Sequence, residues 1–423
     1  MEIFFKKIKT MYWRIVSIGA RYYFGNPSVK LKIVGVTGTN GKTTTATLLY
    51  KIATSLGYKA GLVSTVENII VGEKRLTNMT TPDSISLTKL FAEMVEKGCE
   101  YVFMEVSSHA LDQGRVAGIN FIGGIFTNLT HDHLDYHKNL ENYFLAKKKF
   151  FQMLPATSFA LSNTDDEHGV KMLEGIKARK FLYRFNQIPK DGLQGSLKTV
   201  FLESFFGEIK KLNLDGLELK FNQIEIKSKL LGKFNAYNLL AVWSTCSLLN
   251  FDIEKVNKIL ETIEPPRGRF EHFMSKSGVM VIVDYAHTPD ALQNVLSMAG
   301  QIKSKEGRLI AVFGCGGDRD PFKRSKMGRI GVALSDIPIF TSDNPRSEDP
   351  NKIIYDMMGE LYPEDLKKLK NIPNRHEAIL EAVKIAKSGD IILVAGKGHE
   401  DYQEIKDVKH HFNDMKELKK AFT

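Results

Sequence analysis

The sequence predicts an α/β protein of two main domains, each built on a mostly parallel β-sheet. Short apolar strands alternate with helical stretches along the whole chain, and polar or glycine-rich loops follow several of these strands. The proline- and glycine-containing segment 264–269 separates two such regions and predicts a hinge. A chain of 423 residues is long enough for about two to three domains with cores of their own.

The region before the hinge predicts a central sheet covered by helices. Its apolar strands are expected at residues 31–36, 60–64, 101–106 and 123–128, and its helices at 46–56 and 239–250. Residues 187–228 break this rhythm with alternating runs and turn residues, which predicts a small antiparallel insertion.

The region after the hinge predicts a second α/β unit. Its apolar strands are expected at residues 279–284, 309–313, 337–341 and 391–395. The expected division is therefore an N-terminal helix and linker (1–30), a central domain (31–264) and a C-terminal domain (265–423).

The composition is that of a globular protein, with 43% hydrophobic and 26% charged residues. The net charge of +10 favours anionic partners, but it is spread along the chain, so nucleotides and acidic metabolites are expected rather than nucleic acid. Cys99, Cys246 and Cys315 have no close spacing, which indicates neither a disulfide framework nor a zinc site and suits the cytoplasm.

The N-terminal stretch 1–24 has apolar residues at helical spacing, interrupted by basic residues. Its apolar runs are shorter than the ~18 residues that a membrane span requires, and it lacks the pattern of a signal peptide. An amphipathic helix docked on the protein is expected, rather than membrane contact.

The segment Gly35–Thr45 reads Gly-Val-Thr-Gly-Thr-Asn-Gly-Lys-Thr-Thr-Thr and lies between a predicted strand and a predicted helix. Glycines let the backbone approach a phosphate, and a helix start directs free N–H groups toward it. Lys42 is expected to neutralise the β- and γ-phosphates, and the Thr43 hydroxyl to reach Mg²⁺. The segment predicts binding of a nucleoside triphosphate, although only Gly38 and Gly41 flank Thr39 and Asn40, unlike the common Walker A spacing.

Polar residues follow two further strands of the first region. Glu105 ends one strand, and the segment 131–137, which is rich in histidine and aspartate, follows another. Carboxyl ends of parallel strands face the ligand crevice, so Glu105 and His133 are candidate ligands of Mg²⁺ beside Thr43, although a loop of satisfied polar groups would look similar. The run Lys147-Lys148-Lys149 by itself predicts a solvated helix face.

Four polar loops follow strands of the second region, at residues 284–290, 314–320, 343–346 and 396–400. One such loop would be unremarkable. Four at the strand ends of one domain predict a substrate crevice, in which Arg319 offers a fork to a carboxylate or phosphate.

Taken together, these motifs resemble the Mur ligases, and within them the MurE type. The resemblance runs from about residue 26 to the C-terminus, and its motifs occur in order: Gly-Thr-Asn-Gly-Lys-Thr-Thr (38–44), Thr-Thr-Pro-Asp-Ser (80–84), Glu-Val-Ser-Ser-His-Ala-Leu (105–111), Asp-His-Leu-Asp-Tyr-His (132–137), Asp-Tyr-Ala-His-Thr-Pro-Asp (284–290), Gly-Cys-Gly-Gly-Asp-Arg-Asp (314–320), Asp-Asn-Pro-Arg (343–346) and Gly-Lys-Gly-His-Glu-Asp-Tyr-Gln (396–403). It implies a P-loop ATPase-like central domain and a Rossmann-like C-terminal domain.

The implied activity is ATP-dependent amide synthesis through an acyl phosphate, with ATP and Mg²⁺. By motif, the catalytic residues are Lys42, Glu105, His133 and Lys147, and the metal ligands are Thr43, Glu105, His133 and a carbamylated Lys147. The implied nucleotide-binding residues are Gly38, Thr39, Asn40, Gly41, Lys42, Thr43, Thr44, Asn235, Asn238, Arg269 and Asp284.

The implied substrates are a muramyl dipeptide precursor and meso-diaminopimelate, the amine that the Asp-Asn-Pro-Arg form indicates. The residues that match substrate contacts of the family are Thr80, Thr81, Ser107, Arg115, Arg319, Asn344, Arg346, Gly396 and Glu400.

The chain departs from the family at its N-terminus. MurE enzymes usually have a whole domain there for the uridine nucleotide, whereas here the phosphate loop begins near residue 37. A partner protein could supply that domain. Two alternatives therefore stay open: an amide ligase that acts on another carboxylate, and a non-catalytic ATP-binding subunit.

Overall fold

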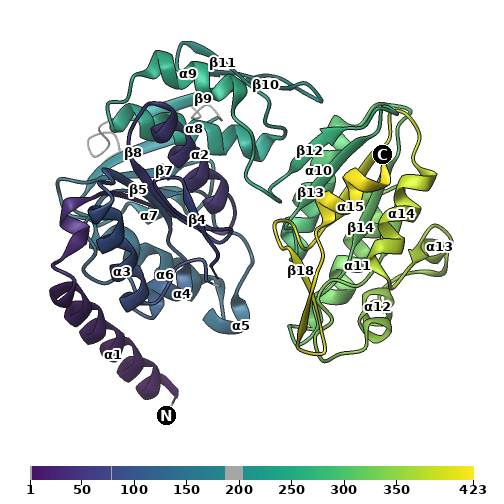
Figure 1. The fold of residues 1–423 in the computed structure, drawn as a ribbon, viewed down its shortest axis with the longest axis horizontal. Helices are drawn as coiled ribbons and strands as arrows, with labels where there is room; N and C mark the ends of the chain where they lie inside the picture. Colours follow the sequence, from purple (N-terminus) through teal and green to yellow (C-terminus); the bar gives the residue numbers. More distant parts are fainter. Residues whose placement is uncertain (1, 78, 186–202) are drawn as a thin grey trace. The chain divides into compact units, whose positions relative to one another are not determined.

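The computed structural model describes residues 2–77, 79–185 and 203–423. The chain divides into two compact units, Met1–Glu264 (unit 1) and Pro265–Thr423 (unit 2), and each contains its own sheet and helices (Figure 1).

Within the described residues, unit 1 is built on an eleven-stranded sheet with the order β11-β10-β9-β8-β7-β6-β1-β5-β2-β3-β4. Its strands are β1 (Lys32–Thr37), β2 (Ala60–Val63), β3 (Asn68–Ile70), β4 (Glu73–Arg75), β5 (Tyr101–Glu105), β6 (Phe121–Phe126), β7 (Phe159–Asn163), β8 (Arg179–Arg184), β9 (Glu203–Asn213), β10 (Gly216–Phe221) and β11 (Ile224–Ser228). The strands from β9 to β2 along this order pair in parallel, and those at the two ends pair antiparallel.

The expected antiparallel insertion is only partly correct. Residues 203–228 do form antiparallel strands, but β9 also pairs in parallel with β8, so these strands extend the main sheet. The rest of the predicted insertion, residues 187–202, lies outside the described residues. The sequence pattern identified the strands but not their partner, because the partner strand is set by packing.

Helices cover both faces of the unit 1 sheet (Figure 1). They are α1 (Glu2–Tyr23), α2 (Lys42–Ser55), α3 (Ser84–Glu96), α4 (Ser108–Asp112), α5 (Leu134–His137), α6 (Leu140–Met153), α7 (Gly169–Met172), α8 (Lys233–Leu248) and α9 (Ile253–Thr262), with a short 3-10 helix at Pro27–Lys30. Alternate strand residues point to opposite faces. Val34 and Phe103 pack with α2 and α8, whereas Ile33 and Met104 pack with α3 and α6.

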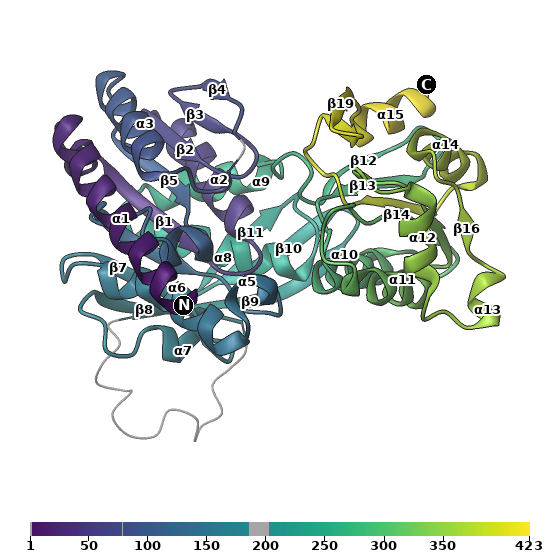
Figure 2. The ribbon, with the colours of Figure 1, turned by 90° about the horizontal axis from the view of Figure 1, so that it is seen from below.

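The N-terminal helix α1 packs along α3, as both ribbon views show (Figure 2). The Ser17 hydroxyl donates to the Ala117 carbonyl at 2.8 Å, which fixes the C-terminal part of α1 to unit 1. Tyr22 and Tyr23 at its end are exposed. None of the helices in the described ranges combines the length and apolarity needed to cross a membrane.

Unit 2 contains a six-stranded sheet with the order β12-β13-β17-β14-β15-β16, counted over the described residues. Its strands are β12 (Glu271–Met274), β13 (Met280–Asp284), β14 (Leu309–Phe313), β15 (Ile337–Phe340), β16 (Lys370–Asn371) and β17 (Ile391–Ala395), and a separate hairpin is formed by β18 (Tyr402–Ile405) and β19 (Val408–His411). Only β12 pairs antiparallel within the sheet. Both units therefore confirm the predicted fold class of two mostly parallel α/β domains.

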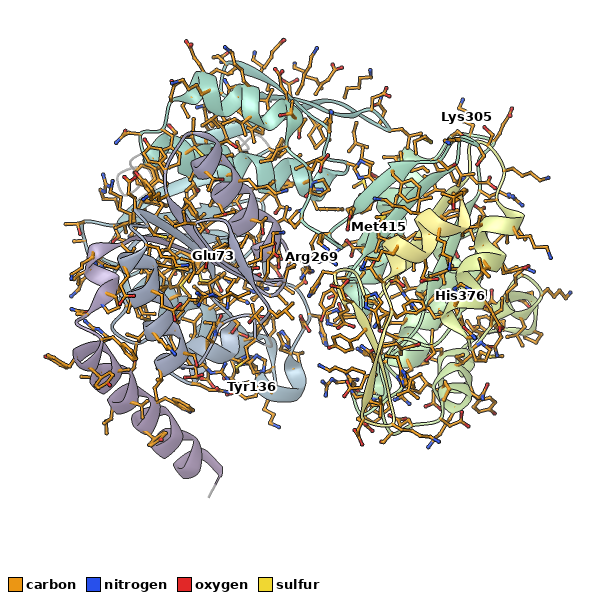
Figure 3. The ribbon with its side chains drawn as sticks, in the orientation of Figure 1. Glu73, Tyr136, Arg269, Lys305, His376 and Met415 are labelled. Carbon is orange, nitrogen blue, oxygen red and sulfur yellow. The ribbon has the colours of Figure 1, made fainter. Side chains whose placement is uncertain are left out.

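Helices also cover both faces of this sheet, with α10 and α11 on one side and α14 and α15 on the other (Figure 2). The helices of unit 2 are α10 (Pro289–Ile302), α11 (Phe322–Leu334), α12 (Pro350–Met358), α13 (Pro363–Leu366), α14 (Arg375–Ile385) and α15 (Asp414–Ala421). Met415 of α15, labelled in Figure 3, packs in the core between the sheet and α14.

A fully buried ion pair joins α14 to α15. Arg375 donates from Nε and Nη2 to the two carboxylate oxygens of Asp414, each at 2.8 Å, and both side chains are 0% exposed. Nη2 also donates to the Ala395 carbonyl at 3.0 Å, at the carboxyl end of β17. The pair therefore connects the two helices to the edge of the sheet where the polar loops begin.

We predict that Asp414→Ala lowers the free energy of unfolding of unit 2 by about 3–5 kcal/mol, because it leaves a buried guanidinium without its counter-charge. Chemical unfolding followed by circular dichroism measures this change. The matched control is Glu417→Ala, which breaks the half-exposed His376–Glu417 contact between the same two helices and should cost no more than about 1 kcal/mol. Equal effects of the two variants would contradict the prediction.

Candidate active site

The turn between β1 and α2 is held in place by the loop that follows β6. The Thr39 N–H donates to the Asn128 carbonyl at 2.8 Å, and the Asn40 N–H donates to Asn128 Oδ1 at 2.9 Å. The Thr127 hydroxyl donates to the Asn40 carbonyl at 2.6 Å. A Cβ on Gly38 would lie 1.9 Å from Thr127 Oγ1, so this position requires glycine. The turn is therefore a rigid cradle.

The helix α2 begins at Lys42, four residues earlier than the sequence pattern predicts, and its N-cap is Gly41. Gly41 has φ 84°, and a Cβ there would lie 2.4 Å from Asn238 Oδ1. Gly41 has no side chain that could cap the helix, so the first N–H groups of α2 are available to an anion. Thr43 and Thr44 lie in this first turn and are buried.

The two predicted asparagines of α8 form a chain of hydrogen bonds behind the turn. Asn238 lies against Gly41 and donates from Nδ2 to Asn235 Oδ1 at 3.1 Å. Asn235 in turn donates from Nδ2 to the Leu231 carbonyl at 2.8 Å. Only Asn238 touches the turn, and Asn235 orients it.

Two lysines meet at one carbonyl oxygen of the turn. Lys42 Nζ donates to the carbonyls of Gly38 and Thr39 at 2.8 and 2.7 Å, and Lys147 Nζ donates to the Gly38 carbonyl at 2.7 Å. The Lys147 ammonium also lies 4.3 Å from the centroid of the Tyr143 ring. Burial, and then repulsion by Lys42, hold the pKa of Lys147 well below its usual range, against the attraction of Asp132.

The prediction that the lysine run at 147–149 forms a solvated face is wrong for Lys147, whose exposed fraction is 1%. The buried residues of α6 are Tyr143, Phe144, Ala146, Lys147, Phe150 and Phe151. This is the spacing of a core-facing helical stripe, and Lys147 lies on it. The apolar neighbours one turn away on each side were the signal in the sequence.

Glu105 lies at the carboxyl end of β5, beside the phosphate turn. Val36 of β1 pairs with Glu105 across the sheet, so the strand ends are neighbours. The Glu105 carboxylate is fully buried and accepts from the Thr65 N–H at 2.7 Å and from the Thr65 hydroxyl at 3.1 Å. The Thr65 hydroxyl lies 3.0 Å from that of Thr80, which brings one predicted substrate residue to the same place.

Three other predicted substrate residues of unit 1 gather at the same strand end. The Thr81 hydroxyl donates to the Glu105 carbonyl at 2.8 Å and accepts from the Ser107 N–H at 3.0 Å. Arg115 donates from Nη1 to the Thr81 carbonyl at 3.1 Å. The Ser107 hydroxyl also caps α4 by accepting from the Ala110 N–H. Thr81, Ser107 and Arg115 thus form one hydrogen-bonded group.

His133 lies at the start of α5 in a left-handed backbone conformation with φ 53°. Its ring is 4.8 Å from that of His109, and its Nε2 is 3.5 Å from Asp132 Oδ2. Desolvation lowers the pKa of His133 to about 4, and His109 and the two lysines add to this effect, while Asp132 opposes it. A neutral imidazole at neutral pH is the form that binds metals. Tyr136, labelled in Figure 3, lies on the same short helix, and its ring is 4.3 Å from that of His109 at an angle of 42°.

The candidate metal ligands do not assemble into a cage by themselves. Across the described ranges, no three His, Cys, Asp or Glu side chains come together in a way that could hold a metal ion. Mg²⁺ is usually bound by one or two carboxylates together with waters and substrate phosphates. A hydroxyl from Thr43, a carboxylate from Glu105 and a neutral His133 beside a phosphate turn fit that kind of site.

Unit 2 has its candidate site at one edge of its sheet. The strands β13, β17, β14 and β15 are neighbours and run in parallel. Each of the four predicted polar loops follows one of these strands, so the structure places the loops side by side.

Asn344 and Glu400 contact each other in this site. Asn344 Nδ2 donates to Glu400 Oε2 at 2.8 Å. Lys397 lies between their loops and donates from Nζ to Asn344 Oδ1 and to Glu400 Oε2, each at 2.9 Å. Gly396 has φ 114°, and a Cβ there would lie 3.1 Å from Asp343 Oδ2.

The two predicted arginines of unit 2 differ in their surroundings. Arg346 donates from Nη1 to the Gly317 carbonyl at 2.7 Å, and its Nε lies 3.2 Å from Glu404 Oε2. Arg319 is exposed and donates to the neighbouring Asp318 carbonyl at 3.2 Å. Arg346 is therefore held in place, and Arg319 is accessible to a ligand.

Arg269 and Asp284 lie close together near Tyr285. The Arg269 guanidinium is 4.7 Å from the centroid of the Tyr285 ring, and its buried Nε has no hydrogen-bond partner in the described structure. Arg269 is labelled in Figure 3. Asp284 accepts from the N–H groups of Phe270 and Ala286 at 2.7 and 2.8 Å. Burial raises the pKa of Asp284 to about 6, against the attraction of Arg269 and these two hydrogen bonds.

The sequence reasoning missed several residues that hold the site. Thr127 and Asn128 support the phosphate turn, Tyr143 contacts both Thr39 and Lys147, and Lys397 joins the two loops of unit 2. Thr127 and Asn128 follow an apolar strand, which is the signal that identified Glu105. Lys397 lies inside a quoted motif, but no local pattern indicates that it is buried.

Two family descriptions match this chain. Residues 36–246 match the Mur ligase middle domain, and residues 268–398 match the Mur ligase, glutamate ligase domain. Similar proteins named UDP-N-acetylmuramoyl-L-alanyl-D-glutamate–2,6-diaminopimelate ligase occur in Parabacteroides distasonis (52% identity, 95% of this chain and 80% of the relative) and Clostridium perfringens (42% identity, 95% and 80%).

Solved structures agree with these matches. A structure of the same named ligase is similar with a TM-score of 0.64 and 34% identity, over 93% of this chain and 78% of the other. A folylpolyglutamate synthase from Thermotoga maritima has a TM-score of 0.67 at 17% identity, over 90% and 89% of the two chains, which shows a shared fold.

We predict that Asp284 makes unit 2 less stable as pH rises from about 4 to 6. Its pKa is about 6 in the folded protein, above the unfolded value of about 3.9, so folding takes up a proton in this range. Relative to Asp284→Asn, the wild type should lose roughly 2–3 kcal/mol of stability over that range and no more above it. Unfolding measured at several pH values tests this.

The comparison for this prediction is Asp390→Asn. Burial by itself raises the pKa of Asp390. Hydrogen bonds from Arg308 and from two backbone N–H groups outweigh this effect and hold the pKa below its usual range. The stabilising contribution of Asp390 is lost as pH falls. The difference in free energy of unfolding between wild type and Asp390→Asn should therefore increase with pH, whereas that for Asp284→Asn decreases. If both differences changed with the same sign, the raised pKa of Asp284 would be contradicted.

Proposed function

This chain belongs to the Mur ligase family, and from that premise we propose that it is an ATP-dependent amide ligase that adds meso-diaminopimelate to the D-glutamate carboxylate of UDP-N-acetylmuramoyl-L-alanyl-D-glutamate. One observation carries the proposal: Lys42 and Lys147 both donate to the Gly38 carbonyl of a glycine-rich turn. An anion cradle that brings together the Lys42 cation and a lysine suited to carbamylation fits phosphoryl transfer, which depends on positioning and charge neutralisation.

The reaction proceeds in two displacements. A substrate carboxylate oxygen attacks the γ-phosphorus of ATP, the bond to the bridging oxygen breaks, and an acyl phosphate and ADP result. The amino group then attacks the acyl carbon, and the tetrahedral intermediate expels inorganic phosphate as the nitrogen loses a proton. Holding the two reactants in line supplies much of the acceleration.

The phosphate turn and the start of α2 would bind the β- and γ-phosphates. Backbone N–H groups in the first turn of α2 would face the anion, and Lys42 would exchange its carbonyl acceptors for phosphate oxygens. Asn238 would keep Gly41 in place, and Arg269 and Asp284 match the family's further contacts to the nucleotide.

Mg²⁺ would be held by Thr43, Glu105, His133 and a carbamylated Lys147. When bound, it would neutralise phosphate charge as that charge shifts toward the leaving group. The pKa of His133, near 4, keeps the imidazole unprotonated at neutral pH. The hydrogen bonds from Thr65 orient the Glu105 carboxylate.

The environment of Lys147 supports the carbamate. A depressed pKa favours the neutral amine, whose nitrogen can attack CO₂: a C–N bond forms as one C–O π bond breaks, and the nitrogen loses a proton. The product is an anion on the core-facing stripe of α6, next to Lys42. This change would place an anion beside the Lys42 cation and so form an ion pair.

The two substrates would be bound by separate groups of residues. Thr80, Thr81, Ser107 and Arg115 would bind the acidic dipeptide, because together they present hydroxyls and one guanidinium at the end of β5. The residues proposed for the amine are Arg319, Asn344, Arg346, Gly396 and Glu400.

The charges of the amine site suit diaminopimelate better than lysine. The distal end of diaminopimelate carries both an ammonium and a carboxylate, and Glu400 and Arg346 would pair with these groups. Lysine lacks the distal carboxylate and would leave Arg346 without its partner.

We also place the enzyme in the cytoplasm. Cys99, Cys246 and Cys315 are free and buried, as expected in a reducing compartment.

We predict a tripeptide product with purified protein, ATP, Mg²⁺, UDP-N-acetylmuramoyl-L-alanyl-D-glutamate and meso-diaminopimelate. Phosphate release and the mass of the product measure the reaction, with lysine as the control amine. Phosphate release without a tripeptide, or with a different acceptor only, would overturn the assigned acceptor. A tripeptide that forms only after a second protein is added would indicate a partner that binds the uridine nucleotide.

We predict that Lys147→Ala lowers kcat by about 100-fold or more. The change removes the carbamate that would hold Mg²⁺, and with it part of the electrostatic stabilisation of the transition state. A small carboxylate such as acetate should restore part of the activity. Intact-mass measurement should detect the mass of one CO₂ on the wild type but not on the variant.

The matched control is Lys149→Ala, two residues along the same helix, where the side chain is half-exposed and pairs with Asp112. This control should keep its turnover. If Lys147→Ala retained full activity, the carbamate would have no role.

A further inference from the structure

Lys397 is a buried lysine at the proposed amine site. Its side chain is 0% exposed, and it lies between Gly396 and Gly398, which both have positive φ values (114° and 52°). Its Nζ donates to Asn344 Oδ1 and Glu400 Oε2 at 2.9 Å, lies 3.8 Å from Asp343 Oδ1 and faces the Tyr402 ring at 5.4 Å. A buried charge of this kind is tolerated only with such partners.

Lys397 determines which way the Asn344 side chain points. An ammonium group only donates hydrogen bonds, so it must face the amide oxygen of Asn344. The Glu404 N–H donates to the same oxygen at 2.9 Å, from strand β18. With its oxygen fixed by two donors, Asn344 directs its Nδ2 toward Glu400 Oε2.

The Glu400 carboxylate is thereby fixed in one orientation. Its Oε2 accepts from both Lys397 and Asn344, and within the described residues no hydrogen bond reaches its Oε1. One carboxylate oxygen is used for positioning, and the other is presented to a cationic ligand.

Lys397 also lies close to two carboxylates. Its Nζ is 3.8 Å from Asp343 Oδ1 and 2.9 Å from Glu400 Oε2, and Asp343 Oδ1 is buried without a hydrogen-bond partner in the described structure. Without Lys397 the two anions would repel each other across a buried gap. Glu400, which is the less buried of the two, would be the one to move.

We infer that Lys397 is a positioning residue for amine selection: it holds Asn344 and Glu400 so that Glu400 Oε1 is presented to an ammonium group of the incoming amino acid. The inference rests on the proposed function only for the identity of the amine. The positioning itself is a property of this cluster.

The experiment compares full-length wild type, Lys397→Met, Glu400→Gln and the double variant, with steady-state kinetics for each substrate. Lys397→Met should raise KM for meso-diaminopimelate by about 10- to 100-fold, as expected when one partner of a buried charge pair is removed. KM for ATP should stay within about twofold, because the hydrogen bonds of Lys397 go to Asn344 and Glu400 and not to the residues assigned to the nucleotide. The ratio of activity with diaminopimelate to activity with lysine should fall.

The double variant separates positioning from a general structural effect. If Lys397 acts through Glu400, then in the Glu400→Gln background the Lys397→Met change should raise this KM by no more than about threefold. In the double variant one carboxylate, Asp343, loses its cation instead of two, so this variant should be less destabilised and should fold even if Lys397→Met does not. Lys370→Met, which breaks the partly exposed Lys370–Glu381 pair in the same unit, is the control and should leave every KM unchanged.

Three results would overturn the inference. They are an unchanged KM for the amine in folded Lys397→Met, equal changes for ATP and amine, and additive effects in the double variant. A crystal structure of Lys397→Met gives a test that does not depend on turnover, because Asn344 and Glu400 should have moved. If the wild type forms no tripeptide, the proposed function fails, and this crystal structure still decides the role of Lys397.

Discussion

The site in unit 1 depends on two lysines that share the carbonyl oxygen of Gly38. Burial, and then the nearby Lys42 cation, disfavour a charge on Lys147 and hold its pKa well below its usual range. The same arrangement underlies both the proposed binding of phosphate at the turn and the proposed carbamate on Lys147.

The sheet brings these two lysines together by close packing. A Cβ on Gly35 of β1 would lie 2.5 Å from the ring of Phe150, so the absence of a side chain lets α6 lie directly on the strand. Lys147 is one turn before Phe150 on the same stripe of α6, and this places its ammonium group at Gly38. Lys42 reaches the same oxygen from the first turn of α2. The packing of α6 on β1 and the chemistry of the turn are thus one structural feature.

Unit 2 uses a buried cation in a different way. Lys397 is surrounded by acceptors, so its charge is compensated and serves to orient an amide and a carboxylate. Behind it, Arg375 donates to the carbonyls of Ser342 and Ala395, which precede the loops of Asn344 and Lys397. A buried arginine pair therefore supports the loops, and a buried lysine arranges their side chains. Each layer satisfies the polar groups of the next, as buried polar networks require.

The sequence by itself determined the fold class, most strands, the phosphate turn and the resemblance that its ordered motifs show. These follow from local rules: apolar periodicity gives strands and helices, and glycine spacing between a strand and a helix gives an anion cradle. It also indicated that the polar loops would meet, because carboxyl ends of parallel strands lie on one edge.

Only the tertiary structure decided which charges are buried and what they contact. The local pattern predicted a surface position for Lys147 and did not single out Lys397. It also did not indicate that β9 would join the main sheet. The reason is physical. The state of a lysine depends on the groups around its Nζ, and for Lys147 and Lys397 some of these groups lie 109 and 53 residues away in the chain, where no local spacing can indicate them.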